Sequence, residues 1–83
     1  MTEILVGVQT VEGADGKTHQ FSYYRLENGR GYGVCIRDGS GGVAMAPGVT
    51  TRRRKIDALL RRMIRGAVSP ASMRDVVEDW LAE

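Results

Sequence analysis

The sequence predicts an α+β fold, in which a three- or four-stranded antiparallel meander is followed by a C-terminal two-helix hairpin packed on one sheet face. The first half alternates apolar and polar residues with the period of a strand, and glycine-rich turns interrupt it. The second half twice repeats apolar residues at helical spacing. With 83 residues the chain is expected to form a single domain, β-rich over 1–50 and helical over 51–83.

Three strands are predicted in the first half of the chain. They cover residues 3–12, 18–27 and 32–38. Asn28 and Gly29 separate the second strand from the third, and this pair is typical of a tight hairpin turn. A short fourth strand over 43–46 is expected to end at Pro47, because proline interrupts strand pairing. Whether that segment pairs at all stays open at this point.

Both faces of the predicted sheet carry apolar side chains. Phe21 and Tyr23 lie on one face, and Tyr24 lies on the other, because side chains alternate along a strand. The helices can cover only one face, and the sequence does not decide which. The second apolar face is predicted to consist of Leu5, Val11, Tyr24, Leu26 and Cys35. Large exposed apolar patches are rare on monomers, so we expect this face to join two copies in a homodimer.

Two amphipathic helices are predicted in the second half. Their apolar stripes are Ile56, Leu59, Leu60, Met63 and Ile64, and then Met73, Val76, Val77, Trp80 and Leu81. Thr51 is the expected N-cap of the first helix, and Gly66 is its expected stop. Ser69 is the expected N-cap of the second helix, with Pro70 at its first position. Trp80 is therefore expected to be a core residue.

The first predicted helix is strongly basic. Residues 52–66 have a net charge of +6, whereas residues 1–51 have −1 and residues 67–83 have −3. The candidate anion- or partner-binding residues are Arg52, Arg53, Arg54, Lys55, Arg61, Arg62 and Arg65. Four of them lie in the first turn, where the helix dipole disfavours each cation by about 0.3–1 kcal/mol.

Three explanations for the basic helix stay open. The acidic residues of the last helix could compensate it, within the chain or in a dimer partner, with Glu78, Asp79 and Glu83 near the start of the first helix. The cations could instead form an ordinary solvated face, or bind a polyanion. The segment has no aromatic residue for base stacking, so any binding to nucleic acid is expected to be weak and non-specific.

No catalytic, cofactor or metal site is expected, and the protein is not expected to be an enzyme. His19 is the only histidine and Cys35 the only cysteine, which is too few ligands for a metal centre. The segment GRGYG over 29–33 precedes a strand rather than a helix, which differs from the dinucleotide-binding fingerprint. There is neither a signal peptide pattern nor a long apolar run, so we expect a cytoplasmic protein with no membrane partner.

The segments SYYRLE and GYGVCI, the amphipathic helix and the ending VSPASMRDVVEDWL together resemble a small uncharacterised bacterial domain-of-unknown-function family of Gram-positive anaerobes. The positions of the ending that carry the resemblance are Ser69, Pro70, Asp75, Val76, Val77, Glu78, Asp79, Trp80 and Leu81. The resemblance covers residues 18–38 and 55–82, and it implies a fold with a helix pair, a cytoplasmic setting and no known activity.

The resemblance transfers no functional residue, and the basic start of the first helix lies outside it. The expected function is therefore a non-enzymatic cytosolic protein-interaction module that self-associates. The alternative is a nucleic-acid-binding protein that uses the basic helix 52–65.

Overall fold

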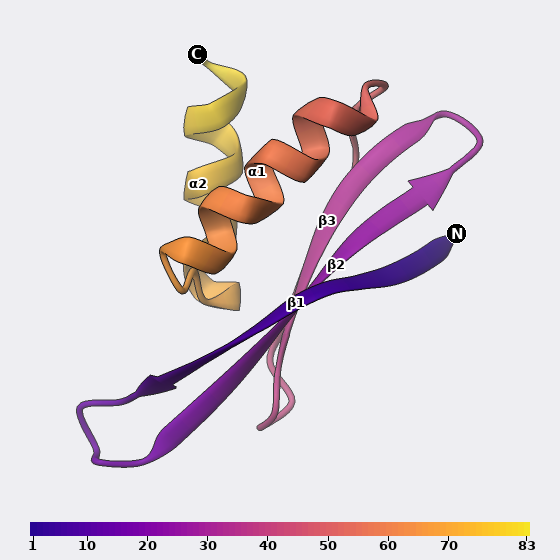
Figure 1. The fold of residues 1–83 in the computed structure, drawn as a ribbon. Coiled ribbons are helices and arrows are strands. Elements are labelled where there is room, and N and C mark those ends of the chain that lie inside the picture. Colours follow the sequence, from indigo (N-terminus) through magenta and orange to yellow (C-terminus); the bar gives the residue numbers. More distant parts are fainter.

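The computed structural model describes all 83 residues as four strands followed by two helices (Figure 1). The elements are β1 (Thr2–Glu12), β2 (Thr18–Asn28), β3 (Gly31–Asp38), β4 (Val43–Thr50), α1 (Arg53–Arg65) and α2 (Pro70–Leu81). The strands pair antiparallel in the order β1-β2-β3-β4, so the sheet is a meander. Both helices lie on the same side of this sheet (Figure 1), and the predicted fold class is confirmed.

The fourth strand is longer than predicted. Its first residues pair with β3 as expected, but the strand continues through Pro47 to Thr50. An edge strand tolerates proline, because one of its sides has no hydrogen-bonded neighbour. The pairing also shifts register between Tyr32 and Val34, and Gly48 has a φ of +65°, which allows β4 to bend there.

A β-bulge in β1 changes which side chains share a face. The register with β2 shifts between Leu5 and Gly7, so one extra residue interrupts the alternation. Leu5 and Val8 therefore lie on the same face, whereas Val11 lies on the other face and packs against the core. The prediction that Val11 shares a face with Leu5 is wrong for this reason.

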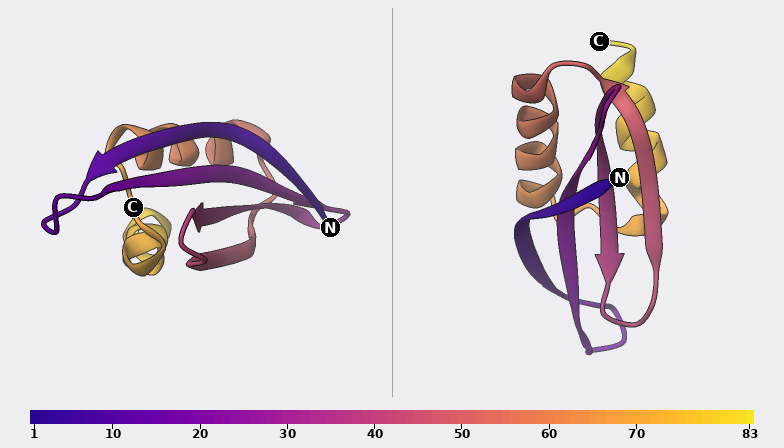
Figure 2. Two further views of the ribbon diagram at one scale, coloured as in Figure 1. Left: turned by 90° about the horizontal axis from the view of Figure 1, so that it is seen from below. Right: turned by 90° about the vertical axis from the view of Figure 1, so that its right-hand side faces the viewer.

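The end of α1 lies directly on the bulged part of β1. The Gln9 side-chain amide donates a hydrogen bond to the Ile64 carbonyl oxygen at 2.9 Å. A Cβ atom placed on Gly7 would lie only 2.8 Å from Cδ1 of Ile64. Figure 2 shows the long, curved β1–β2 hairpin, whose turn reaches beyond the helices. The missing side chain at Gly7 thus lets the helix approach the strand closely.

The core lies between the two helices and the face of the sheet that carries Tyr23. Its buried residues are Phe21, Tyr23, Val34, Ile36, Ile56, Leu59, Leu60, Met63, Met73 and Val77. Tyr23 is fully buried, and its hydroxyl donates a hydrogen bond to the Val68 carbonyl oxygen at 2.9 Å. Trp80 packs against this core but is only partly buried, and Leu81 is 57% exposed. The last turn of α2 is therefore less buried than its stripe predicted.

The predicted helix ends are correct with one exception. Gly66 is the C-cap of α1, and the Ser69 hydroxyl caps α2 with Pro70 in its first turn. The N-cap of α1, however, is Arg52 rather than Thr51, and no side chain caps that end. The start of α1 therefore combines uncapped backbone N–H groups with basic side chains, and acidic side chains nearby are needed to offset this positive charge.

Candidate interaction surface

The sheet face opposite the helices is uncovered, and its side chains form rows across all four strands. The pairing places Leu5, Tyr24, Cys35 and Met45 in one row, and Val8, Ser22, Arg37 and Val43 in the next. Leu5 is 56%, Val8 44%, Val43 47% and Met45 44% exposed. Four large apolar side chains thus point to solvent from one surface, which we call the open face.

Only part of the predicted self-association surface is available on the open face. Leu5 and Tyr24 lie there as predicted. Leu26 and Cys35 also lie on this side of the sheet, but they are 1% and 0% exposed. Val11 faces the helices because of the bulge. Of the five predicted residues, only Leu5 and Tyr24 are therefore accessible to a partner.

The burial of Leu26 has a local cause, and the burial of Cys35 affects its chemistry. Leu26 is opposite Gly33, where a Cβ atom would overlap the carbonyl oxygen of Ala46, so the backbone of β4 passes closely over this position. Burial raises the pKa of the Cys35 thiol above its ordinary value, so the thiol is protonated at neutral pH. A buried, protonated thiol is not a nucleophile, and His19, the only imidazole, lies on the opposite face.

Three exposed apolar residues of the open face are not among those predicted from the sequence. Strict alternation from Leu5 would place Val8 on the covered face, and the bulge brings it to the open face. Val43 and Met45 lie on β4, the strand whose pairing the sequence left open. The alternation of large and small residues in VAMA is the signal that could have identified both, since Ala44 faces the helices between them.

An ion pair crosses the open face from β3 to β1. Nη2 of Arg37 donates hydrogen bonds to Oε1 and Oε2 of Glu3 at 3.0 and 3.2 Å. The Arg37 guanidinium lies 5.9 Å from the ring centroid of Tyr24, a distance typical of a cation–π contact. The Glu3 carboxylate also raises the pKa of Arg37, which keeps the guanidinium charged. The centre of the open face thus contains one acidic and one basic side chain.

A second exposed surface lies on α1, on the opposite side of the molecule. Arg53 pairs with Asp57 at 3.6 Å and Arg62 pairs with Glu83 at 3.1 Å. The other five cations of the segment are exposed and make no ion pair; they are Arg52, Arg54, Lys55, Arg61 and Arg65. At 100° per residue, Arg54, Arg61 and Arg65 follow one line opposite the buried stripe, and we call these three residues the basic ridge.

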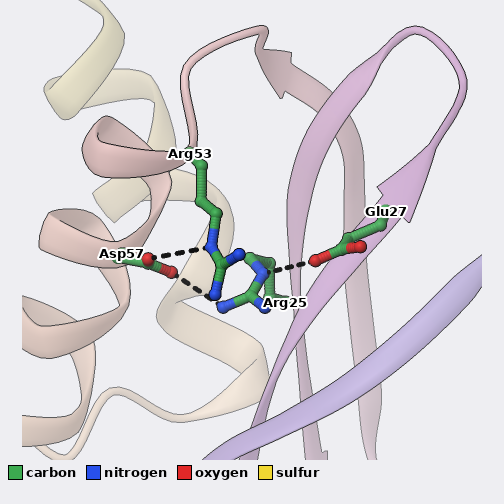
Figure 3. A network of polar contacts seen from close by, with 4 residues as sticks. All are labelled: Arg25, Glu27, Arg53 and Asp57. Carbon is green, nitrogen blue, oxygen red and sulfur yellow. Dashed lines mark hydrogen bonds and ion pairs between the residues drawn. The ribbon is translucent and has the colours of Figure 1, made fainter.

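Of the four cations at the start of α1, only Arg53 has an acidic partner, which is Asp57 of the same helix, in a network that Figure 3 shows. Arg25 on β2 is only 8% exposed, and it bonds to Oε2 of Glu27 at 2.7 Å and to Oδ1 of Asp57 at 3.0 Å. The hydrogen bond to Glu27 raises the pKa of Arg25. Asp57 therefore links the sheet to the first turn of α1 and offsets part of its positive charge.

The predicted compensation by the last helix is correct for one residue only. Glu83 pairs with Arg62, but Arg62 is in the last turn of α1 rather than at its start. Glu78 pairs with Arg74 inside α2, and Asp79 makes no ion pair. The hairpin therefore does not bring Glu78 and Asp79 to the basic first turn.

A comparison with family models shows the family to which the chain belongs. One model matches residues 2–83, nearly the whole length. The chain belongs to DUF6514, a family of unknown function. The match extends the resemblance noted above from two segments to the complete fold. No curated protein and no solved structure is detectably similar to this DUF6514 chain.

The DUF6514 fold has few groups that could act chemically. No three His, Cys, Asp or Glu side chains come together as a potential metal site. His19 lies 3.6 Å from Asp15 at the exposed β1–β2 turn, and both side chains are at least one-third exposed. None of its helices has the length and apolar character needed to span a bilayer.

Proposed function

We propose that this DUF6514 chain is a non-enzymatic protein-interaction module in which two copies join through their open faces. The observation that carries the proposal is the exposure of four large apolar side chains on one face of the sheet, two on each outer strand. Burying such side chains against a partner removes apolar area from water, which is the main favourable term in association. An antiparallel sheet with one uncovered apolar face is well suited to sheet-on-sheet packing.

The charges at the centre of the open face favour a second copy as the partner. Glu3 and Arg37 balance each other there, so two identical faces meet without net repulsion. The open face has no excess of either charge at its centre, so it would not attract a strongly acidic or a strongly basic partner. The buried free thiol supports a reducing cytoplasm as the setting, and the resemblance noted in the sequence supports a bacterial origin.

The size of the open face sets the expected affinity. Four strands about 4.8 Å apart, with about 26 Å of paired length, give a footprint of about 500 Å² on each copy. Stable interfaces typically bury about 800 Å² on each partner, so this one is small. We expect a reversible homodimer with a dissociation constant in the micromolar range, on the order of 1–100 µM.

The test measures the molar mass in solution as a function of concentration. Light scattering coupled to size exclusion between about 1 and 200 µM should show a monomer–dimer transition. Leu5→Glu and Met45→Glu should each shift the transition to at least about tenfold higher concentration, because a carboxylate is then desolvated in the interface. Leu81→Glu is the matched control, because Leu81 is 57% and Leu5 56% exposed, but Leu81 lies on α2.

A purely monomeric wild-type protein over this range would refute the proposal. Equal effects of Leu5→Glu and Leu81→Glu would also contradict it, because the interface would then not be specific to the open face.

The second candidate function is binding of a nucleic acid backbone by the basic ridge. Its support is that Arg54, Arg61 and Arg65 lie in line and none has an acidic partner in the chain. Without aromatic residues on α1, such binding depends on phosphate contacts alone and does not depend on base sequence. Three contacts predict that log K falls with log salt concentration with a slope of about −2.7.

Fluorescence anisotropy with labelled duplexes tests this second candidate. Replacing the basic ridge with Gln should reduce the salt slope nearly to zero. Replacing Lys17, Arg30 and Arg74 with Gln is the matched control, because these exposed cations lie off α1 and the charge change is the same. Equal loss of binding in the two triple variants would exclude the ridge as the site.

A further inference from the structure

The two charged residues of the open face are arranged symmetrically about Tyr24. Tyr24 pairs with Leu5 of β1 on one side and with Cys35 of β3 on the other. Glu3 of β1 pairs with Leu26 of β2, and Leu26 is two residues from Tyr24. Arg37 lies on β3 beside Ser22, two residues from Tyr24 in the opposite direction. Tyr24 is therefore at the midpoint of the line from Glu3 to Arg37.

Within one chain, this ion pair spans a long diagonal. Two strand spacings and the rise of four residues separate the two backbone positions by about 16 Å. Both side chains must therefore extend across Tyr24 to meet, and they remain 34% and 41% exposed. The two backbones of packed sheets are only about 10 Å apart, so the same two side chains need a shorter reach between facing sheets.

From this geometry we infer that Arg37 and Glu3 exchange partners when two copies meet, so that each Arg37 binds Glu3 of the partner subunit. A two-fold axis that lies in the interface over Tyr24, at right angles to the line between the two charges, produces this arrangement. The inference rests on the proposed dimer, and it adds the position of the axis and the residues that select the partner.

The exchange explains why a charged pair lies in the middle of an apolar surface. In the free chain the pair covers the Tyr24 ring, with the guanidinium 5.9 Å from the ring centroid. In the dimer the same charges leave Tyr24 free to meet its own symmetry copy on the axis. Only a partner with the opposite charge at each position fits, so the pair gives specificity for a second copy of the chain.

Charge reversal tests the exchange directly. In Glu3→Arg the centre of the face carries two positive charges, and in Arg37→Glu it carries two negative charges. Each variant alone should dimerise at least about tenfold more weakly than the wild type, because like charges then face each other. An equimolar mixture of the two variants should form a mixed dimer with nearly wild-type affinity. The double variant Glu3→Arg/Arg37→Glu should regain its homodimer.

Glu12→Arg is the control for a general effect of charge. Glu12 lies on the same strand at its far end and is exposed, so the net charge change equals that of Glu3→Arg. It should change the dimer affinity by no more than about twofold, and mixing it with Arg37→Glu should not restore dimers. Circular dichroism should show that all variants stay folded, because the replaced side chains are on the surface.

The outcomes separate this inference from the proposed dimer. A wild-type protein that stays monomeric overturns both. A wild-type dimer whose reversal variants associate normally, or whose mixture stays monomeric, overturns the exchange and leaves the open face as the interface.

Discussion

Both faces of the sheet carry apolar side chains, but they differ in burial at the outer strands of the open face, since Leu26 and Cys35 on its central strands are buried. On the covered face Tyr23, Val34 and Ile36 are fully buried, whereas Leu5 and Val8 on the open face are 56% and 44% exposed. The difference lies in side-chain size at the outer strands. Gly7, Ala44 and Ala46 leave room for helices on the covered face, while larger residues project from the other face of the same strands. Small residues, rather than apolar ones, therefore indicate where a second layer packs.

The difference in burial between the two faces should be largest for two adjacent tyrosines. Tyr23→Ala removes a fully buried ring from the core, so it should lower the free energy of unfolding by about 3–5 kcal/mol. Tyr24→Ala on the open face should cost about 1 kcal/mol or less in the monomer. Urea denaturation at low protein concentration measures both. Equal costs would mean that the two faces are equally packed.

Two arginines offer the same contrast for charged groups. Arg25→Ala leaves the carboxylates of Glu27 and Asp57 without a buried cation, and it should cost about 2 kcal/mol because both carboxylates are about one-third exposed. Arg37→Ala on the open face should cost about 0.5 kcal/mol or less. Urea midpoints at low and high salt measure this difference. A larger cost at Arg37 would mean that its ion pair with Glu3 stabilises the fold more than the Arg25 network does.

Two glycines, at which β4 and α1 approach the neighbouring strand closely, should differ in the stability lost when a methyl group is added. Gly33→Ala pushes a methyl group into the backbone of β4, so it should cost about 1–3 kcal/mol. Gly7→Ala meets only the flexible end of Ile64, and it should cost about 1 kcal/mol or less. Thermal melts followed by circular dichroism would rank the two variants. The opposite order would show that α1 is fixed more rigidly than β4.

The smallest expected effect is a loss of stability at alkaline pH. Burial raises the pKa of the Cys35 thiol and that of the Tyr23 hydroxyl above their ordinary values. Each group binds its proton more tightly in the folded state, so its stabilisation is complete below the ordinary pKa and is lost as pH rises through the raised value. Urea midpoints between pH of about 8 and about 10.5 should therefore fall.

In the Cys35→Ala variant the first part of this decline should disappear, while the part due to Tyr23 should remain. An unchanged pH profile in that variant would show that the open-face thiol does not titrate with folding.

The sequence alone was sufficient for features that depend on local periodicity. Strand alternation placed Tyr23 and Tyr24 on opposite faces, and helical spacing identified the stripe that begins at Ile56. Strict alternation fails where the bulge after Leu5 adds one residue, because the bulge moves Val8 onto the face of Leu5 and Val11 onto the opposite face.

Contacts between segments that are distant in the chain could not be predicted from the sequence either. Arg25 and Asp57 are separated by 32 residues, and no spacing pattern relates a strand residue to a helix residue at that distance. The burial of Leu26 likewise depends on the path of β4 over Gly33. Such features follow from how the layers pack, which the strand and helix patterns do not specify.

The placement of both helices on one side of the sheet has a consequence for valency. If two chains join at their open faces, four layers result, with helices on the two outer surfaces and a basic ridge on each. The ridges then point in opposite directions, so they cannot hold a single short anionic segment from two sides. If each ridge also binds a polyanion, as proposed for the second candidate function, such a dimer is bivalent and would connect two separate polyanions, with an avidity set by the spacing between them rather than by the strength of either ridge.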